Sequence, residues 1–193
     1  MDAEGHVIGN HSYAHQNLTK GAAAAMQDQV NKCAAIIRGA VGYDPVLLRP
    51  PGGNYDNRLL GYAKEKGVAI MGDIPIYVAA DSADAWAGRE LFETDAEGKP
   101  RRVAGCPPDY FAADGQLWGN PLFDWDSMAK TGYAWWVRRI KHMCSTYDVV
   151  RIDHFRGFAG YYAIPYGEAT ARNGRWREGP GYALFAAIKK KLG

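Results

Sequence analysis

Residues 67–78 read GVAIMGDIPIYV, and this stretch decides the fold. Apart from the carboxyl group of Asp73, the run is apolar without alternation, as in strands that are covered on both faces. Such strands occur in parallel sheets with helices packed on both sides. Three further apolar segments predict strands of the same sheet: residues 6–10, 45–49 and 148–153.

Helical periodicity separates these strands. Helices are predicted over residues 22–39, 56–65, 128–146 and 182–192, where apolar residues recur at helical spacing. Strands alternating with helices indicate βα units, and four such units make half of an eight-unit barrel. We therefore expect an α/β fold containing about half of a TIM-type barrel; a flavodoxin-like open sheet is the alternative.

The alternation stops after the third predicted strand. Residues 79–128 are rich in Gly, Pro, Asp and aromatic side chains. Unstructured loops of this length are uncommon in compact domains, so we expect a long irregular insertion that contains short helices.

Composition narrows the class of protein. With 193 residues, 47% of them hydrophobic, the chain can bury one core, so residues 1–193 are predicted to form a single domain. A net charge of +2 without a basic stripe argues against nucleic acid as a partner. The N-terminus lacks the pattern of a signal peptide, and no apolar run approaches the ~20 residues of a membrane span. We expect a cytoplasmic protein.

The sequence GNHSYAH (residues 9–15) raises the question of a metal site. His11 and His15 are four residues apart, a spacing that lets two imidazoles reach one ion in a helix or a tight turn. A catalytic zinc needs a third protein ligand, and Asp73 or Asp153 at a strand end could supply it. Zinc or another divalent metal is therefore one hypothesis; the other is that both are ordinary imidazoles and that no cofactor is required.

The first third of the chain resembles a known family. Residues 4–20 (EGHVIGNHSYAHQNLTK) and 47–67 (LLRPPGGNYDNRLLGYAKEKG) resemble polysaccharide deacetylases of the NodB-homology type. The resemblance implies that His11 and His15 are metal ligands of an H[ST]xxH motif and that Arg49 begins an RxPxG motif. It also implies an Asp-Asp pair on an earlier strand and a later His, which have no counterpart in the sequence.

The remainder resembles a second family. Residues 72–92, 103–125, 149–165 and 173–185 are similar to 4-alpha-glucanotransferases, the amylomaltases. In RIDHFRG the resemblance implies that Asp153 is the nucleophile and that Arg151 keeps it ionised. It further implies sugar-binding residues and weak binding of malto-oligosaccharides; these residues are Asp81, Tyr110, Gln116, Trp118 and Asn120.

A second carboxyl group is the open question for this chemistry. Retaining glycosyl transfer needs an acid and base about 5 Å from the nucleophile. The resemblance places that glutamate, and a further substrate-orienting aspartate, later than the matched segments, so Asp153 and Arg151 are interpreted as vestigial. Glu168 or Glu178 would have to replace the acid if activity survives.

The junction of the two resemblances indicates the origin of the chain. It falls within residues 60–72, inside one βα unit, whereas natural fusions keep each domain whole. We interpret the chain as a recombinant or selected chimera of segments 1–66 and 67–193, folded but without a complete active site. A residual carbohydrate-active enzyme that uses Asp153, and a metal-binding module at His11 and His15, remain the alternatives.

Half a barrel also predicts a partner. An open sheet leaves edge strands with unpaired backbone groups and exposes an apolar inner face. We therefore expect a homo-oligomer, either a two-fold dimer or an exchange of segments between copies.

Overall fold

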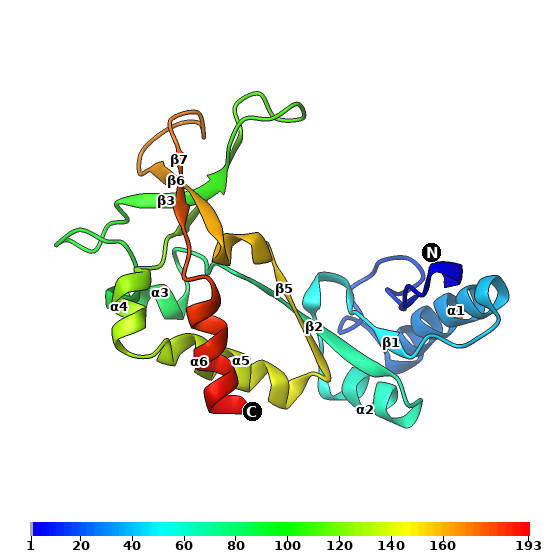
Figure 1. Ribbon diagram of the computed structural model, residues 1–193. Coiled ribbons are helices and arrows are strands. Elements are labelled where there is room, and N and C mark those ends of the chain that lie inside the picture. Colours follow the sequence, from blue (N-terminus) through cyan, green and yellow to red (C-terminus); the bar gives the residue numbers. More distant parts are fainter. Residues whose placement is uncertain (1) are drawn as a thin grey trace. The chain divides into compact units, whose positions relative to one another are not determined.

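The computed structural model describes residues 2–193 and divides them into two compact units (Figure 1). The first unit contains the described residues up to Ile74 together with His142–Arg151, and the second contains Pro75–Lys141 and Ile152–Gly193. The chain is a mixed α/β protein with one three-stranded and one four-stranded sheet. The first unit draws residues from both of the predicted segments.

The three-stranded sheet has the order β1-β2-β5, with β1 and β2 parallel. The bounds are β1 Leu47–Leu48, β2 Ala69–Pro75 and β5 Val149–Asp153. The strand predicted over residues 6–10 is reduced to a single bridge from Asn10 to Leu48. The strand predicted over residues 68–78 ends at Pro75, whose nitrogen has no hydrogen to donate to a ladder.

The α-helices of the first unit lie close to their predicted positions, as α1 (Ala23–Val41) and α2 (Asn57–Glu65). The unit also contains two 3₁₀ turns that the sequence did not predict, η1 (Asp2–Glu4) and η2 (Pro51–Gly53). α1 ends at Gly42, which adopts the left-handed conformation that favours glycine. α2 begins after Asp56, whose carboxylate accepts a hydrogen bond from the Leu59 nitrogen at 3.0 Å.

One hydrophobic core joins the two predicted segments within the first unit. Leu48 and Leu59 from the deacetylase-like segment pack in the same cluster as Ile70 and Tyr147 from the glucanotransferase-like segment. Gly72 allows the Tyr147 ring to approach, because a Cβ atom there would lie 2.2 Å from Tyr147 Cδ2. The Tyr147 ring also contacts Tyr55 edge-on, with ring centroids 4.8 Å apart.

The close approach of the Tyr147 ring to Gly72 should make this position intolerant of a side chain. Gly72→Ala should lower the free energy of unfolding of the first unit by about 2 kcal/mol, because the added methyl overpacks against the Tyr147 ring. In a Tyr147→Ala background the same substitution should cost much less. Urea unfolding of the four proteins measures both values; equal costs of Gly72→Ala in both backgrounds would contradict the contact.

The second unit contains an antiparallel sheet where the sequence indicated an irregular insertion. Its order is β4-β3-β6-β7, and every pairing is antiparallel. The strands are β3 Arg102–Cys106, β4 Gln116–Pro121, β6 Gly160–Pro165 and β7 Arg175–Glu178. The helical elements of this part of the chain are α3 Ala83–Ala87, η3 Arg89–Leu91, α4 Trp125–Lys130, α5 Ala134–Thr146, η4 Phe155–Phe158 and α6 Tyr182–Leu192.

Of the two helices predicted in this region, one is divided in the structure and the other is confirmed. The helix predicted over residues 128–146 is in fact two, α4 and α5, separated at Gly132 and Tyr133. Both of these residues have positive φ angles, which no continuous right-handed helix accepts. The final helix, predicted over residues 182–192, is confirmed as α6.

Aromatic packing and one carboxylate hold the second unit together. Trp136, Phe123 and Phe158 are fully buried, and the Trp136 ring contacts the rings of both phenylalanines. Across the antiparallel sheet, Glu93 accepts hydrogen bonds from Arg102 at 2.7 Å and from Arg177 at 3.1 Å. Glu93, which lies outside the strands, thus links β3 to β7.

No helix among residues 2–193 is long and apolar enough to span a membrane.

Candidate functional site

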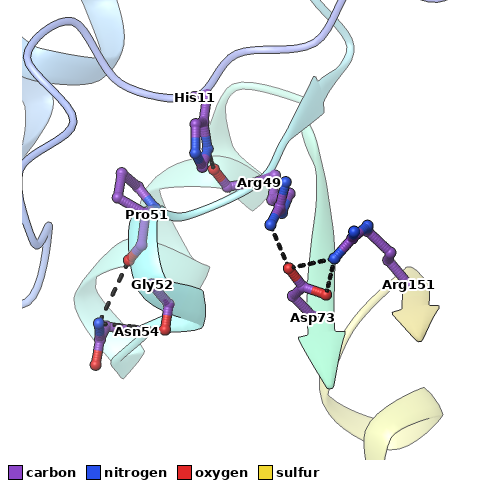
Figure 2. A network of polar contacts seen from close by, with 7 residues as sticks. All are labelled: His11, Arg49, Pro51, Gly52, Asn54, Asp73 and Arg151. Atoms are coloured by element: carbon purple, nitrogen blue, oxygen red, sulfur yellow. Dashed lines mark hydrogen bonds and ion pairs between the residues drawn. The ribbon is translucent and has the colours of Figure 1, made fainter. Parts of the chain in front are cut away.

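Three charged side chains meet at the carboxyl end of the parallel sheet in the first unit (Figure 2). Asp73 lies on β2, Arg151 on β5, and Arg49 directly follows β1. Arg151 Nη1 donates to both carboxylate oxygens of Asp73, at 2.7 and 2.9 Å, and Arg49 Nη2 donates to Oδ2. The Asp73 side chain is only 15% exposed, so the two guanidinium groups provide most of the polar partners that its burial requires.

The histidine motif lies next to this cluster. The Nδ1–H group of His11 donates to the Arg49 carbonyl at 2.6 Å, as Figure 2 shows. Ser12 and His15 have positive φ angles, so the backbone makes a tight turn here. The turn brings the ring centroids of His11 and His15 to 4.8 Å from each other. The hydrogen bond at Nδ1 leaves Nε2 of His11 as the nitrogen available to a ligand.

These residues do not fit a catalytic metal centre. Among the residues that the structure describes, no group of three or more His, Cys, Asp or Glu side chains could hold a metal ion. Asp73, one of the two carboxylates proposed as the third ligand, instead accepts hydrogen bonds from Arg49 and Arg151. The other, Asp153, belongs to the second unit. Asp73 therefore does not complete a site with His11 and His15, and the described residues of the first unit offer them no third ligand.

Loss of the Asp73 carboxylate should destabilise the first unit. Asp73→Asn should lower the free energy of unfolding by about 2–4 kcal/mol, because the partly buried guanidinium groups of Arg49 and Arg151 then lose the charge of this carboxylate. Asp81→Asn, at an exposed position of the second unit, is the control and should change little. Urea unfolding measures both; a loss at Asp73 no larger than at Asp81 would mean that the cluster contributes no stability.

The second unit contains a separate cavity of about 340 Å³ beside the end of β5. Among its lining residues are Tyr77, Trp118, Asn120, Asp153 and His154. Asp153 is the last residue of β5, and His154 immediately after it adopts the left-handed conformation. This backbone is uncommon for a residue with a side chain, and such strain often marks a functional position.

Hydrogen bonds and ring contacts fix the walls of this cavity. Trp118 Nε1 donates to Gln116 Oε1 at 3.0 Å, and the Trp118 ring meets the His154 ring edge-on at 4.8 Å. Asn120 Nδ2 donates to the Val78 carbonyl at 2.8 Å. Gln116 therefore acts here by orienting the Trp118 ring, since it does not itself line the cavity.

Burial sets the protonation of two groups in this cavity. It lowers the pKa of His154, an effect that Arg156 reinforces and Asp153 opposes, so the imidazole is neutral at pH 7. Burial also raises the pKa of Tyr77, which keeps its hydroxyl protonated. The cavity thus offers neutral hydrogen-bonding groups and aromatic surface next to one carboxyl group.

Several residues of the sequence analysis lie elsewhere. Tyr110 is 96% exposed and contacts Phe111, and Asp81 lines a different cavity beside α3. Neither Glu168, which accepts a hydrogen bond from Asn173, nor Glu178 on β7 lines the cavity at Asp153. Sequence reasoning missed Tyr77 and His154 as site residues, although His154 lies within the RIDHFRG motif and Tyr77 within residues 72–92 of the same resemblance.

Two family models match the chain. Residues 57–193 match the model described as 4-alpha-glucanotransferase, and residues 1–71 match the model described as polysaccharide deacetylase. Both resemblances predicted from the sequence are thereby confirmed. The two matches share residues 57–71, which contain α2 and the start of β2.

Curated relatives of the longer segment are 4-alpha-glucanotransferases. The protein of Streptococcus pneumoniae serotype 4 is 55% identical over 136 residues, which cover 70% of this chain and 27% of the relative. The chloroplastic/amyloplastic protein of Solanum tuberosum is 53% identical over 132 residues, which cover 68% of this chain and 23% of the relative. The chain thus spans about a quarter of the length of these relatives.

A solved structure is similar over most of the chain. The amylomaltase from Streptococcus agalactiae in complex with acarbose is 36% identical, with a TM-score of 0.68, and the similarity covers 92% of this chain and 37% of that protein. The family-model match extends over more than half of the residues. Together with the RIDHFRG motif at the end of β5, these findings show that the chain belongs to the 4-alpha-glucanotransferase family through residues 57–193.

Proposed function

We propose that the second unit binds α-1,4-linked glucose residues in the cavity at Asp153 and that Asp153 acts there as the nucleophile of glycosyl transfer. The observation that carries this proposal is the grouping of Asp153 with Trp118, Asn120 and Tyr77 around one cavity. Aromatic faces pack against the apolar faces of sugar rings, and the amide and hydroxyl groups suit sugar hydroxyls. The relatives named 4-alpha-glucanotransferase support the choice of substrate.

The chemistry of the first step follows from the carboxylate. An oxygen of Asp153 would bond to the anomeric carbon while the bond from that carbon to the leaving oxygen breaks. The leaving oxygen then needs a proton from a second carboxyl group. Asp153 is the one carboxyl group among the described residues that line the cavity, so cleavage of an ordinary glucosidic bond should be slow.

We further propose that the chain arose by recombination of two enzyme segments within one βα unit. The overlap of the two family matches at residues 57–71 supports this, and so does the core that Leu48, Leu59, Ile70 and Tyr147 share. The deacetylase-like segment then contributes helices, a strand and Arg49 to the fold. It contributes no deacetylase chemistry, because the described residues lack a complete ligand set.

A substrate with a good leaving group tests the nucleophile by itself. α-Maltotriosyl fluoride needs little acid assistance, since fluoride departs with the bonding electron pair while the Asp153 oxygen bonds to the anomeric carbon. We expect a covalent maltotriosyl adduct on the peptide containing Asp153, detected by intact and peptide mass spectrometry.

Asp153→Asn should form no adduct, and Asp126→Asn, at an exposed position of α4 that lines neither cavity, should react like the parent protein. With maltotriose itself we expect glucose release far below that from the fluoride. Adduct formation on Asp153→Asn, or none on the parent protein while it binds maltotriose, would contradict the nucleophile assignment.

We also propose that two copies associate along the free edge of β5. The order β1-β2-β5 leaves β5 at the edge of the parallel sheet within the described residues. Val149 on this edge is 40% exposed and Val150 half-buried, and neither carries the charge that usually protects an edge.

Sedimentation equilibrium at micromolar concentrations should give twice the chain mass. Val149→Lys should shift the equilibrium toward the monomer, because a lysine on the edge disfavours strand pairing. Arg175→Lys on β7, which keeps the charge of an exposed strand, is the control and should leave the mass unchanged. A parent protein that is monomeric throughout this range would overturn the proposal.

A further inference from the structure

A second cavity of the second unit combines an exposed indole with unpaired charges. It has a volume of about 460 Å³ and lies between α3 and the turn at residues 95–99. This volume falls within the range of about 300–1,000 Å³ typical of small-molecule sites. The cavity shares no lining residue with the one at Asp153, so it constitutes a separate place on the same unit.

Trp86 forms one wall of this cavity. Its side chain is 75% exposed on α3, and the aromatic contacts among the described residues do not include it. α3 is fixed at its start by Ser82, whose hydroxyl accepts a hydrogen bond from the Ala85 nitrogen at 3.2 Å. An exposed tryptophan on an anchored helix, with small alanines beside it, presents a flat apolar face to a ligand.

The opposite wall is a rigid turn. The Asp95 carboxylate accepts hydrogen bonds from the nitrogens of Glu97 and Lys99, at 3.1 and 2.8 Å. Gly98 between them has a φ angle of +83°, and Arg89 packs closely over it, because a Cβ there would lie 3.2 Å from Nη1. The turn therefore holds its place without a ligand.

Four charged side chains surround the space between these walls. They are Asp81, Arg89, Glu97 and Lys99. Within residues 2–193 none of the four forms a side-chain hydrogen bond or ion pair with another protein side chain. Two acids and two bases sum to zero charge while offering both donors and acceptors.

We propose that this cavity is a second binding site for a neutral oligosaccharide, with one sugar ring stacked on Trp86. A balanced set of donors and acceptors matches the hydroxyls of a sugar, which both donate and accept hydrogen bonds. An inorganic anion would select an excess of positive charge, and an apolar molecule would leave the four charges without water. The choice of an α-1,4-glucan as the probe rests on the proposed function.

The experiment measures binding of maltoheptaose by isothermal titration calorimetry in a Trp118→Ala background, in which the cavity at Asp153 is weakened. We expect the remaining binding to fall about tenfold on Trp86→Ala, because the stacked face is lost. Trp86→Phe should restore most of it. Trp176→Ala, which removes another exposed tryptophan of the same unit, is the matched control and should leave it unchanged.

Three results would overturn the inference. They are no maltoheptaose binding in the Trp118→Ala background, binding there that Trp86→Ala leaves intact, and binding of inorganic phosphate that is tighter than that of maltoheptaose. Failure of the proposed function would appear in two other measurements. These are the absence of a covalent adduct on Asp153 with maltotriosyl fluoride, and maltoheptaose binding by the parent chain that Trp118→Ala leaves unchanged.

Discussion

The ion pairs of Asp73 are the constraint on which the first unit depends. A carboxylate that is 15% exposed on a central strand is costly unless it is fully hydrogen-bonded, and its partners come from two segments of different family origin. Arg151 belongs to the glucanotransferase match and Arg49 to the deacetylase match. Both arginines reach the same carboxylate because parallel strands present their carboxyl ends at one edge of the sheet.

The core beneath this cluster explains how two families can share one unit. Both segments present a helix followed by a buried parallel strand, and the apolar residues of such units are interchangeable in kind if volume is conserved. Gly72 is the position where this tolerance ends, since the Tyr147 ring occupies the space of any side chain there. Whether the two segments pack together therefore depends on side-chain shape at a few core positions. It does not require that all the contacting residues come from one family.

The sequence predicted one long parallel strand and several helices, but it indicated none of the antiparallel strands. β2, α2 and α6 were found because apolar periodicity and capping residues are local signals. Glycine and proline interrupt the sequences of β3 and β4, and this composition indicates an irregular insertion instead of strands. Gly105 is required there, since a Cβ atom would lie 2.1 Å from the Gln116 carbonyl oxygen. The Asp73–Arg151 pair spans 78 residues, and no local pattern indicates it.

The proposed recombination would affect the two chemistries differently, because each is built in a different way. A metal site needs three ligands from separate parts of a chain, so exchanging one segment removes it even when His11 and His15 keep their close approach. A sugar site is assembled from aromatic faces and single polar groups, each of which retains its local function when others are absent. The cavity at Asp153 draws all its lining residues from the glucanotransferase match, so the proposed recombination would replace none of them. Sugar binding is therefore the property that recombination at residues 57–71 would preserve, whereas covalent turnover requires a second carboxyl group that this cavity does not itself supply.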